Sequence, residues 1–466
     1  MEDKNINEIM KIICIKGKLK LLSPLLIGNG EPVFTDNDLV KDINGNPFIP
    51  GTSIAGSIRN YMEKFSNENN RIIDTLFGGE SKDSKQNKDS NQSLLYFYDS
   101  ILIKEGTITI RDGIAVDDFI KVEKAEEHAK YDYQVLERDN EFDFRLELHL
   151  RNKFSDKKED ILKALAVIIS ELQRGNIYIG AKSNRGLGNI KLTNVEILKF
   201  DFDELKLREK LLKEFLKFNW DKEFNKVSEK AFESGIYFMD MIRNCKSINT
   251  NTHIKIPLKV RDTIFIRDYL LQNTDVDSSQ LKYNDRFIIP GTTWAGAVKH
   301  KMFIILYDLG LTEEQTREKI EELFGCADKK KEAMASKIRF EESMDSDRSK
   351  FIDIRRTRID RFTGGACNKA LFEGRAAVHG NIFLDIYIKD KNQWKIGLLI
   401  LSLYDLMSGM LAVGGETAVG RGLIVSEDDF SINGESILID EHPLSKEDEK
   451  IYFKCLKEEI DKSIRR

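Results

Sequence analysis

Residues 49–62 read IPGTSIAGSIRNYM, and residues 289–302 read IPGTTWAGAVKHKM. The same unusual word therefore occurs twice in one chain, with half of its positions identical and with Arg59 matched by Lys299. A repeat at this distance is far too long to be one unit of a solenoid. We therefore predict two fused copies of one globular domain.

Two further landmarks follow each copy of this word in the same order. The first is Leu-Phe-Gly, at residues 76–78 and again at 323–325. The second is a glycine-rich segment, GAKSNRGLGNI from residue 180 and GGETAVGRGLI from residue 414. Loops tolerate insertions better than the elements that they connect. Landmarks that keep their order while their spacing drifts slightly are typical of diverged copies of one fold.

Length and composition describe a chain with room for more than one hydrophobic core. Its 466 residues are 41% hydrophobic and 32% charged, and the net charge of -5 argues against a protein that coats nucleic acid indiscriminately. No apolar run approaches the roughly 20 residues of a spanning helix, and the N-terminus lacks the apolar stretch of a signal peptide. We expect a cytoplasmic protein without a membrane partner. The five cysteines form no C-x-x-C pair, so neither a disulfide framework nor a cysteine zinc site is indicated.

The succession of strand-like and helical patterns predicts the domain boundaries. We place a first domain at residues 12–200, a helical linker at 201–253, a second domain at 254–426 and a C-terminal helical tail at 427–466. In each domain the order strand, helix, strands, helix, strand is that of a split βαβ unit. The predicted fold class is α+β, with two tandem ferredoxin-like (RRM-like) domains.

The repeated word predicts a helix whose start binds an anion. A helix that begins after Pro-Gly-Thr-Ser or Pro-Gly-Thr-Thr would offer unpaired N–H groups, hydroxyl donors and a favourable dipole to a phosphate. A glycine one turn later would let a nucleic-acid backbone approach closely, and a basic residue follows it. These residues are Gly51, Thr52, Ser53, Gly56 and Arg59 in the first copy, and Gly291, Thr292, Thr293, Gly296 and Lys299 in the second. The alternative is an ordinary N-capped helix.

The glycine-rich segments predict backbone nests that bind phosphate. The contributing residues would be Lys182, Ser183, Arg185 and Gly186 in the first copy, and Thr417 and Arg421 in the second. Glu416 replaces Lys182 in the second copy, so RNA contact there would depend more on backbone amides and Arg421. The spacing matches neither a Walker loop nor a Rossmann fingerprint, which makes ATP and NAD poor hypotheses.

Together these motifs resemble the RAMP superfamily. The likeness is carried by LLIGNG at residues 25–30, NPFIPGTSIAGSIR at 46–59, RDGIAVD at 111–117, YDY at 131–133 and GAKSNRGLG at 180–188. Within the superfamily the chain is most similar to backbone subunits of type III CRISPR effector complexes, where chains with two fused domains occur in subtype D. The likeness covers almost all of both predicted domains and leaves out the helical linker and the tail.

The resemblance implies a function in RNA-guided RNA cleavage. In these subunits an RRM-like palm binds guide CRISPR RNA through its backbone, and neighbouring effector subunits stack along the guide. Each subunit inserts a thumb hairpin that displaces a nucleotide, and complementary target RNA is cut opposite those sites. Base pairing supplies the sequence selectivity.

The resemblance also implies the catalytic residues. The family uses an aspartate in the loop before the Pro-Gly word, and Asp36 occupies that place, with Asp38 near enough to assist. The second loop offers Asp275 and Asp277, and counting back from Pro290 favours Asp277. The expected activity is that of a metal-dependent endoribonuclease using a divalent ion, magnesium by expectation, with its ligands unassigned.

The second copy also holds the best basic patch of the chain. Arg355, Arg356, Arg358 and Arg361 lie within seven residues, in the region that the resemblance assigns to the thumb. They would contact guide or target phosphates, with Phe372 against a base. In the first copy His128 is a candidate proton shuttle, and an exposed thumb histidine is the plainer interpretation.

Two alternatives remain open. A non-catalytic scaffold would bind guide RNA and leave cutting to other subunits. A guide-processing endoribonuclease of the same superfamily would need a histidine near the first helix of the fold, and only His300 in the second copy meets that condition. A metabolic enzyme is the weakest hypothesis, because no cofactor motif or acid–base cluster is visible.

Overall fold

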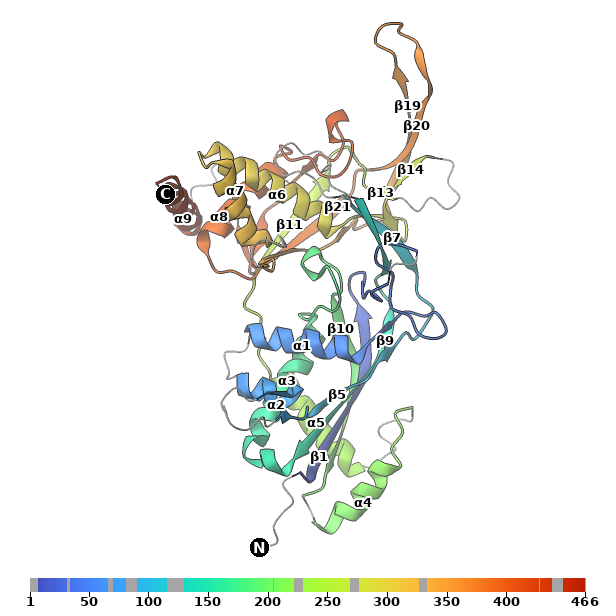
Figure 1. Ribbon diagram of the computed structural model, residues 1–466, viewed down its shortest axis with the longest axis vertical. Coiled ribbons are helices and arrows are strands. Elements are labelled where there is room, and N and C mark those ends of the chain that lie inside the picture. The colour runs from blue at the N-terminus through green and yellow to red at the C-terminus, as the bar shows by residue number, and fades with distance from the viewer. Residues whose placement is uncertain are drawn as a thin grey trace.

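The fold is described by a computed structural model that covers residues 7–31, 34–65, 70–80, 90–114, 130–203, 205–221, 229–268, 276–326, 333–426, 428–437 and 447–465. Two domains of similar construction follow one another along the chain, the first in the lower half of Figure 1 and the second in the upper half. Within the described residues, no helix is long and apolar enough to cross a membrane.

The first domain is built on a four-stranded antiparallel sheet with the order β10-β1-β9-β5. Counted along the chain these strands have the order 4-1-3-2, with helices after the first and third, which is the ferredoxin-like arrangement. The sheet strands are β1 (Ile9–Leu21), β5 (Leu95–Phe97), β9 (Glu141–Arg151) and β10 (Ile190–Asp201), and the helices are α1 (Gly51–Phe65), α2 (Asn70–Phe77) and α3 (Lys158–Arg174). Short strands β2 (Phe48–Ile49), β3 (Gly79–Glu80), β4 (Ser90–Asn91) and β6 (Ser100–Ile101) complete the domain.

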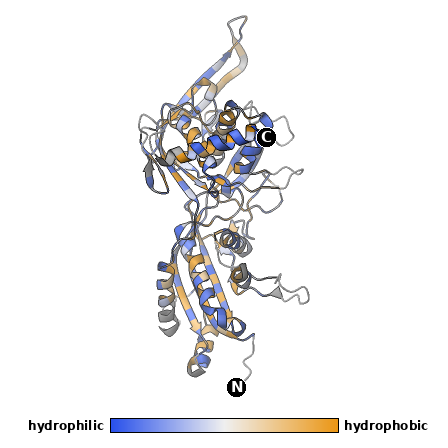
Figure 2. Cartoon of the chain, turned by 90° about the vertical axis from the view of Figure 1, so that its left-hand side faces the viewer, coloured by the Kyte–Doolittle hydropathy of each residue, from blue (hydrophilic) through white to orange (hydrophobic). Residues whose placement is uncertain are grey.

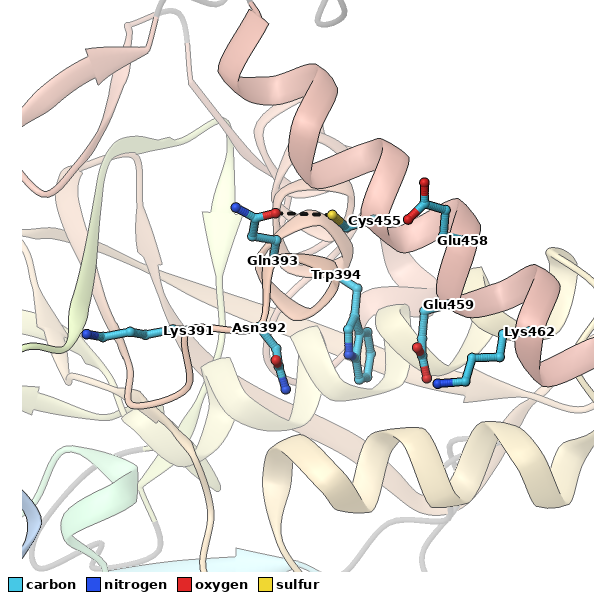
Figure 3. Close-up of a pocket in the computed structure, with 8 residues that line it drawn as sticks. All are labelled: Lys391, Asn392, Gln393, Trp394, Cys455, Glu458, Glu459 and Lys462. Carbon is cyan, nitrogen blue, oxygen red and sulfur yellow. Dashed lines mark hydrogen bonds between the residues drawn. The ribbon is translucent and has the colours of Figure 1, made fainter.

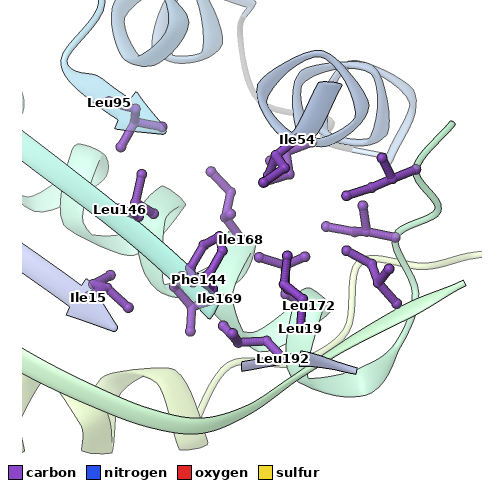
Figure 4. Packing of buried hydrophobic residues seen from close by; sticks show 14 of the residues in the cluster. Ile15, Leu19, Ile54, Leu95, Phe144, Leu146, Ile168, Ile169, Leu172 and Leu192 are labelled. Atoms are coloured by element: carbon purple, nitrogen blue, oxygen red, sulfur yellow. The ribbon is translucent and has the colours of Figure 1, made fainter. Parts of the chain in front are cut away.

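The long strands of this domain bury apolar side chains on both faces. Hydrophobic and hydrophilic residues alternate along them (Figure 2). One face of β1 carries Ile15 and Leu19 into the core beneath α1 and α3, where they pack near Phe144 and Ile168 (Figure 4). Each fully buried side chain of this size stabilises the fold by about 1.5–3 kcal/mol. The sheet is therefore a rigid support for the loops at its edge.

The segment predicted as a linker belongs to the first domain in its packing. Helix α4 (Leu205–Leu216) covers the other face of the sheet, where Leu211 packs against Cys14 and Phe200. Helix α5 (Glu229–Arg243) adds Phe238 and Ile242 to the main core. Amphipathic helices need a surface that buries their apolar side, and the sheet supplies it. The connection between the domains is thus shorter than the sequence suggested.

The second domain repeats the same arrangement. Its sheet has the order β17-β21-β11-β23-β24, with β22 also paired to β11. The strands are β11 (Thr252–Val260), β17 (Ile338–Phe340), β21 (Asn381–Ile388), β22 (Ile424–Val425), β23 (Phe430–Ile432) and β24 (Glu435–Ile437). The helices are α6 (Gly291–Asp308), α7 (Glu313–Phe324), α8 (Gln393–Met407) and α9 (Glu447–Ile464), and α9 packs on α8. The predicted α+β class with two ferredoxin-like domains is confirmed.

Each domain carries a hairpin beside its sheet. In the first domain β7 (Ile108–Ile114) pairs with β8 (Lys130–Leu136). In the second, β19 (Lys350–Ile359) pairs with β20 (Ala366–Val378) and projects away from the body (Figure 1). The remaining strands, all in the second domain, are β12 (Thr263–Ile264), β13 (Arg267–Asp268), β14 (Ser278–Gln280), β15 (Lys282–Tyr283), β16 (Arg286–Ile289) and β18 (Ser343–Met344). The first hairpin between residues 115 and 129, with His128, lies outside the described residues.

A buried charge cluster joins the two domains. Arg111 bonds Glu137 at 2.8 Å within the first domain and pairs with Glu342 of the second domain at 3.4 Å. Arg138 makes a further ion pair with Glu342. Burial alone would lower the pKa of Arg111, but the carboxylates of Glu342 and Glu137 outweigh it and raise that pKa. We call these four residues the joint cluster; because buried charges are costly unless paired, it favours one relative placement of the domains.

Further hydrogen bonds between the domains surround the joint cluster. The hydroxyl group of Tyr178 donates to Oε1 of Glu341 at 2.7 Å, and Nζ of Lys389 donates to Asn184 at 2.7 Å. A Cβ added to Gly186 would lie 2.7 Å from the carbonyl oxygen of Phe340, closer than side chains pack. The glycine-rich loop of the first domain therefore rests directly on the edge strand of the second.

Candidate nucleic-acid interface and cleavage loops

Asp36 is held to the first hairpin by two hydrogen bonds. Its own N–H donates to Oδ1 of Asp132 at 2.9 Å, and the N–H of Asp132 donates to Oδ2 of Asp36 at 2.9 Å. Asp36 is exposed to solvent, and among the described residues its other carboxylate oxygen, Oδ1, accepts no hydrogen bond. The loop thus presents one fixed, accessible carboxylate oxygen.

Asp277 has the same relation to the second hairpin. The N–H of Glu373 donates to Oδ2 of Asp277 at 2.9 Å, and the N–H of Asp277 donates to the carbonyl of Glu373 at 3.0 Å. The separation along the chain is 96 residues, the same as between Asp36 and Asp132. Asp277 is also exposed. Structurally it is the counterpart of Asp36, whereas Asp275 lies outside the described residues.

Asp38 lies in a different environment from that of Asp36 in the same loop. It is buried, and its carboxylate accepts the N–H groups of Phe34 and Thr35 together with the Thr35 hydroxyl group. This is a turn-forming arrangement in which a short carboxylate satisfies nearby backbone donors. Asp38 therefore shapes the loop and does not face an incoming strand.

The start of α1 is less open than the sequence suggested. The N–H of Gly51 donates to Oδ1 of Asp99 at 2.7 Å, so a carboxylate already lies at the helix start. The N–H of Ser53 donates to the carbonyl of Pro50 at 2.9 Å. Thr52 remains exposed. The prediction of a row of unpaired N–H groups at this helix start is wrong.

The start of α6 is covered by the joint between the domains. A Cβ added to Gly291 would lie 2.4 Å from the carbonyl oxygen of Arg185, which belongs to the first domain. The N–H of Thr293 donates to Pro290 at 2.9 Å, as in the first copy, and Thr292 is half-buried. This helix start therefore packs in part against the first domain, and phosphate binding by Thr292 and Thr293 stays a prediction.

The two mid-helix glycines match their prediction more closely. Gly56 and Gly296 are exposed, and a Cβ added to either would have no neighbour within 4 Å. A flat helix surface of this kind admits a nucleic-acid backbone. Arg59, by contrast, uses its guanidinium group on Glu63, Asp74 and the carbonyl of Gly78. Its predicted role as a phosphate contact is not supported, because these bonds tie α1 to the end of α2.

Lys299 is half-buried, and it already takes part in an interaction within the protein. It lies three residues after Gly296, near the surface that the missing Cβ leaves flat. His300, next to it, is likewise half-buried and engaged. Neither residue has the environment of an exposed, uncommitted base.

Lys182 is the best-placed cation of the first glycine-rich loop. Its Nζ atom lies 4.0 Å from the ring centroid of Tyr131 and 3.9 Å from that of Tyr133, a double cation–π contact. Burial lowers the pKa of Lys182 to about 8, with help from the nearby charge of Arg185. Because Tyr131 and Tyr133 flank Asp132, Lys182 lies on the hairpin that also holds Asp36. Arg185 is exposed and Ser183 half-buried beside it.

The second loop replaces this lysine by a carboxylate that binds two arginines. Glu416 pairs with Arg421 at 2.6 Å and also with Arg356 of the β19–β20 hairpin. Arg421 is buried and paired with Glu416, so the structure gives no support to the predicted RNA contact of Arg421. Thr417 lies half-buried in the same turn. Two arginines and one glutamate leave this corner with the same net charge as Lys182 provides in the first copy.

The basic patch predicted in the second copy divides into two parts. Arg355 pairs with Glu373 on the facing strand of the same hairpin at 2.9 Å, whereas Arg356 is bound to Glu416 and so ties the hairpin to the second glycine-rich loop. Arg358 and Arg361 lie further out, where both are exposed. Phe362 is 99% exposed at the turn of this hairpin. The outer part of the hairpin is therefore the segment best able to reach a nucleic acid.

A surface pocket lies away from these loops in the chain, where α9 crosses the start of α8 (Figure 3). It has a volume of about 480 Å³ and is lined by Lys391, Asn392, Gln393, Trp394, Cys455, Glu458, Glu459 and Lys462. Its charges are mixed in sign and it is open to solvent. Such a pocket does not describe a catalytic centre for a polymeric substrate.

The carboxylates of the first loop fit a hard cation only in part. Oδ2 of Asp112 is buried without a hydrogen-bond partner, and burial raises the pKa of Asp112, with Asp132 acting in the same direction against Lys130. However, no three metal-binding side chains converge anywhere in the described residues. Magnesium commonly binds one or two carboxylates together with substrate phosphates. These residues therefore suit an ion that RNA helps to hold, and they form no protein-only cage.

Several residues of this arrangement had no role in the sequence interpretation. Asp132 and the two tyrosines around Lys182 lie within the YDY motif, and Arg111 opens the RDGIAVD motif. A signal was present, since an aspartate 96 residues after Asp36 mirrors a glutamate at the same distance from Asp277. The equal spacing alone does not reveal a hydrogen bond between the loop and the hairpin. It becomes informative only once the two hairpins are known to be equivalent.

The fold, the paired loops and the exposed basic hairpin define a tandem RRM-like protein suited to RNA. The profile of the RAMP superfamily matches residues 18–191 and 257–425, one match for each domain. The chain therefore belongs to the RAMP superfamily, and the resemblance seen in its motifs is confirmed. Membership supports an RNA-binding, CRISPR-associated subunit. No curated protein matches the chain.

Proposed function

We propose that this chain is a backbone subunit of a type III CRISPR ribonucleoprotein. It binds guide CRISPR RNA, and it cleaves complementary target RNA at two loops, one in each domain. The single observation that carries the proposal is the repeated loop geometry: Asp36 and Asp277 each receive a backbone N–H from a hairpin residue 96 positions later. A duplicated position that keeps an exposed, oriented carboxylate is better explained by chemistry than by turn formation.

The RNA-binding part of the proposal rests on the charges that remain available. Arg185 near Lys182, and Arg358 with Arg361 on the projecting hairpin, are exposed. Gly56 and Gly296 leave flat helix surfaces that a strand of RNA could approach. Contacts of this kind recognise the phosphate backbone and its shape, so base pairing between guide and target would supply the sequence selectivity.

The proposed reaction is an internal phosphoryl transfer within the target strand. The 2′-oxygen attacks the adjacent phosphorus, its proton passes to the free carboxylate oxygen of Asp36, and the bond from phosphorus to the 5′-oxygen breaks. Water donates a proton to that 5′-oxygen. The products are a 2′,3′-cyclic phosphate and a 5′-hydroxyl end. The hydrogen bond from the N–H of Asp132 fixes the other oxygen of Asp36, so the oxygen that accepts the proton keeps one orientation.

A divalent ion, magnesium by expectation, would bind to Asp36 and Asp132 together with the target phosphate and would stabilise negative charge on it. In the second copy Glu373, which takes the place of Asp132, is paired with Arg355 at 2.9 Å. That arginine already supplies positive charge beside the second loop. The second site therefore depends less on the ion than the first.

The test is cleavage by the assembled complex. Guide RNA and the other subunits are reconstituted with this chain, and a labelled complementary RNA is compared with copies carrying a single 2′-deoxy nucleotide at each mapped cut. We expect discrete cuts with cyclic phosphate ends, and loss of a cut where its 2′-hydroxyl is missing. Guide retention without any cut would instead favour the scaffold function.

The guide-processing alternative is tested in the same material. It requires His300, which is half-buried on α6 and engaged in a contact of its own. His300→Gln should leave guide length and target cleavage unchanged. Guide RNA of unprocessed length in that variant would favour the alternative.

A further inference from the structure

The two cleavage loops are held by hairpin residues whose side chains have different tasks. In the first copy the carboxylate of Asp132 accepts the N–H of Asp36, at 2.9 Å from Oδ1. In the second copy the backbone does this, because the carbonyl of Glu373 accepts the N–H of Asp277 at 3.0 Å. The carboxylate of Glu373 therefore does not hold the loop. Instead its Oε1 atom pairs with Nε of Arg355 at 2.9 Å.

The strand registers show which residue of the first copy corresponds to Arg355. Arg355 faces Glu373 across the second hairpin, and Asp112 faces Asp132 across the first. Asp132 and Glu373 each donate an N–H to the loop aspartate of their own domain, so these two residues are equivalent. Arg355 and Asp112 are then equivalent as well. The same position beside the loop carries an acid in the first copy and an arginine in the second.

The surroundings of the first loop are short of positive charge. Oδ2 of Asp112 is buried and has no hydrogen-bond partner among the described residues. Asp132 and Asp268 lie close enough for their charges to act on Asp112, and they are opposed there by Lys130. A phosphate that approached this loop would meet more negative than positive charge. The first loop therefore needs a cation that comes with the substrate.

The second loop already has a cation beside it. The side chain of Arg355 is 73% exposed, so its guanidinium group extends beyond the pair with Glu373. The neighbouring pair on this hairpin, Arg375 with Asp353 at 2.6 Å, is balanced in charge. A guanidinium group carries several N–H donors in one plane, so it can bind a carboxylate and the oxygens of a phosphate together. A phosphate placed beside Asp277 would be within the range of such a group.

We propose that Arg355 is a catalytic residue of the second cleavage loop, where its guanidinium group binds the target phosphate in place of a divalent ion. The inference rests on the proposed function and specifies how the second site differs from the first. The 2′-oxygen of the target attacks the adjacent phosphorus, and its proton passes to Asp277. The bond from phosphorus to the 5′-oxygen breaks, and water donates a proton to that oxygen. Arg355 stabilises the negative charge that develops on the non-bridging oxygens.

The simpler interpretation is a cross-strand ion pair that only stabilises the hairpin. In that case the second cut would need a divalent ion as much as the first. The two interpretations are separated by cleavage in the reconstituted complex with Mg²⁺ and with EDTA. Asp36→Asn and Asp277→Asn assign each cut to its loop, and filter binding shows that the target RNA stays bound in EDTA. We expect chelation to slow the first cut about a hundredfold and the second by less than about threefold.

Variants of Arg355 test the residue itself. Arg355→Asp introduces the acid of the first copy, so the second cut should be lost in EDTA and should recover with Mg²⁺. Arg355→Lys keeps the charge, and its second cut should stay independent of the ion. The matched control is Arg348→Asp, because Arg348 is also exposed and pairs with one carboxylate, that of Asp285 at 2.8 Å. It should cut as the wild type does. The amount of guide RNA in each complex shows that assembly is equal.

A second measurement does not depend on cleavage. Mn²⁺ binding is followed by electron paramagnetic resonance in complexes with a target RNA that carries a 2′-deoxy nucleotide at both cuts. We expect Asp36→Asn to bind one Mn²⁺ fewer than the wild type and Asp277→Asn to bind the same number. Loss of an ion in Asp277→Asn would overturn the inference, because the second loop would then hold a metal.

Three cleavage results would also overturn it. The first is a second cut that EDTA suppresses as strongly as the first cut. The next is an Arg355→Asp variant that still cuts at the wild-type rate in EDTA. The last is a wild-type complex that cuts only at the position assigned to Asp36, since the second loop would then be inactive. A complex that makes neither cut in Mg²⁺ overturns the proposed cleavage function itself.

Discussion

Two aspartates of one loop, Asp36 and Asp38, illustrate how backbone donors decide what a carboxylate can do. Asp38 satisfies three donors of its own turn and is buried. Asp36 receives one N–H, from Asp132 on a distant hairpin, and keeps an oxygen at the surface. A carboxylate with one fixed and one accessible oxygen is oriented without being neutralised. Asp277 likewise receives one N–H, from Glu373, and is exposed.

At this scale the first prediction concerns Lys182. Burial lowers its pKa to about 8, so its charge is present below that pH and is lost as the pH rises through it. Guide affinity of the complex should therefore fall about fivefold between pH 7 and pH 9.5 at 0.1 M salt, because one phosphate neutralisation is lost. Lys182→Arg keeps its charge over this range and is the matched control. Filter binding across pH measures both, and equal pH profiles would contradict the prediction.

The sequence could predict the positions of the loop aspartates but not their bonds. Pattern and resemblance led to Asp36 directly and to Asp277 by counting, since both depend on order along the chain. The surroundings of the two helix starts could not be predicted, because Asp99 accepts the N–H of Gly51 in one copy and the first domain packs against Gly291 in the other. Ion pairs such as Glu416 with Arg421 likewise depend on packing, which no local pattern encodes.

At the scale of elements, the β19–β20 hairpin has two regions with different roles. Near the body Arg356 pairs with Glu416, which ties the hairpin to the second glycine-rich loop, and Arg355 pairs with Glu373 across the hairpin itself. Further out, Arg358 near the end of β19 and Arg361 in the turn between the strands are exposed. The order and type of the elements could be predicted from periodicity. The sequence could not show that some arginines of this run pair with carboxylates while others remain exposed.

This division gives the second prediction. Arg358→Ala combined with Arg361→Ala should lower the slope of log affinity against log salt by about 1.5, since each residue neutralises roughly one phosphate of single-stranded RNA. The folded state should keep its stability, because both side chains are exposed. The control is Arg355→Ala, whose charge is already paired with Glu373. Titration of guide RNA at several salt concentrations measures the slopes, and a control that loses as much slope as the double variant would refute the division.

At the scale of the molecule, the joint determines how the two loops are spaced. The side chains of Arg111 and Glu342 are 7% and 2% exposed and lie in different domains, so the pair links the domains through groups that water does not reach. Duplicated domains could be predicted from the repeated word, and their fold from element order. The placement of one domain against the other could not be predicted. It depends on charged residues, such as Arg111, to which the sequence motifs assigned no role.

The third prediction tests the joint cluster. Arg111→Met removes one partner and leaves Glu137 and Glu342 short of a buried cation, which should destabilise the chain by about 3–5 kcal/mol. Arg145→Met is the control, because Arg145 pairs with the exposed Asp221, and pairs of that kind contribute about 0–1 kcal/mol. Urea unfolding followed by fluorescence compares the two. A loss for Arg111→Met no larger than for Arg145→Met would show that the cluster does not hold the domains.

The most direct test of the central claim is a cut map for four versions of the reconstituted complex: wild type, Asp36→Asn, Asp277→Asn and the double variant. Asparagine keeps the oxygen that accepts the hairpin N–H in each loop and removes only the charge, so the loops should stay folded. We predict that each single variant loses one cut at its own position, by at least a hundredfold in rate, and that the double variant loses both. Full cleavage at every position in Asp36→Asn would contradict the account.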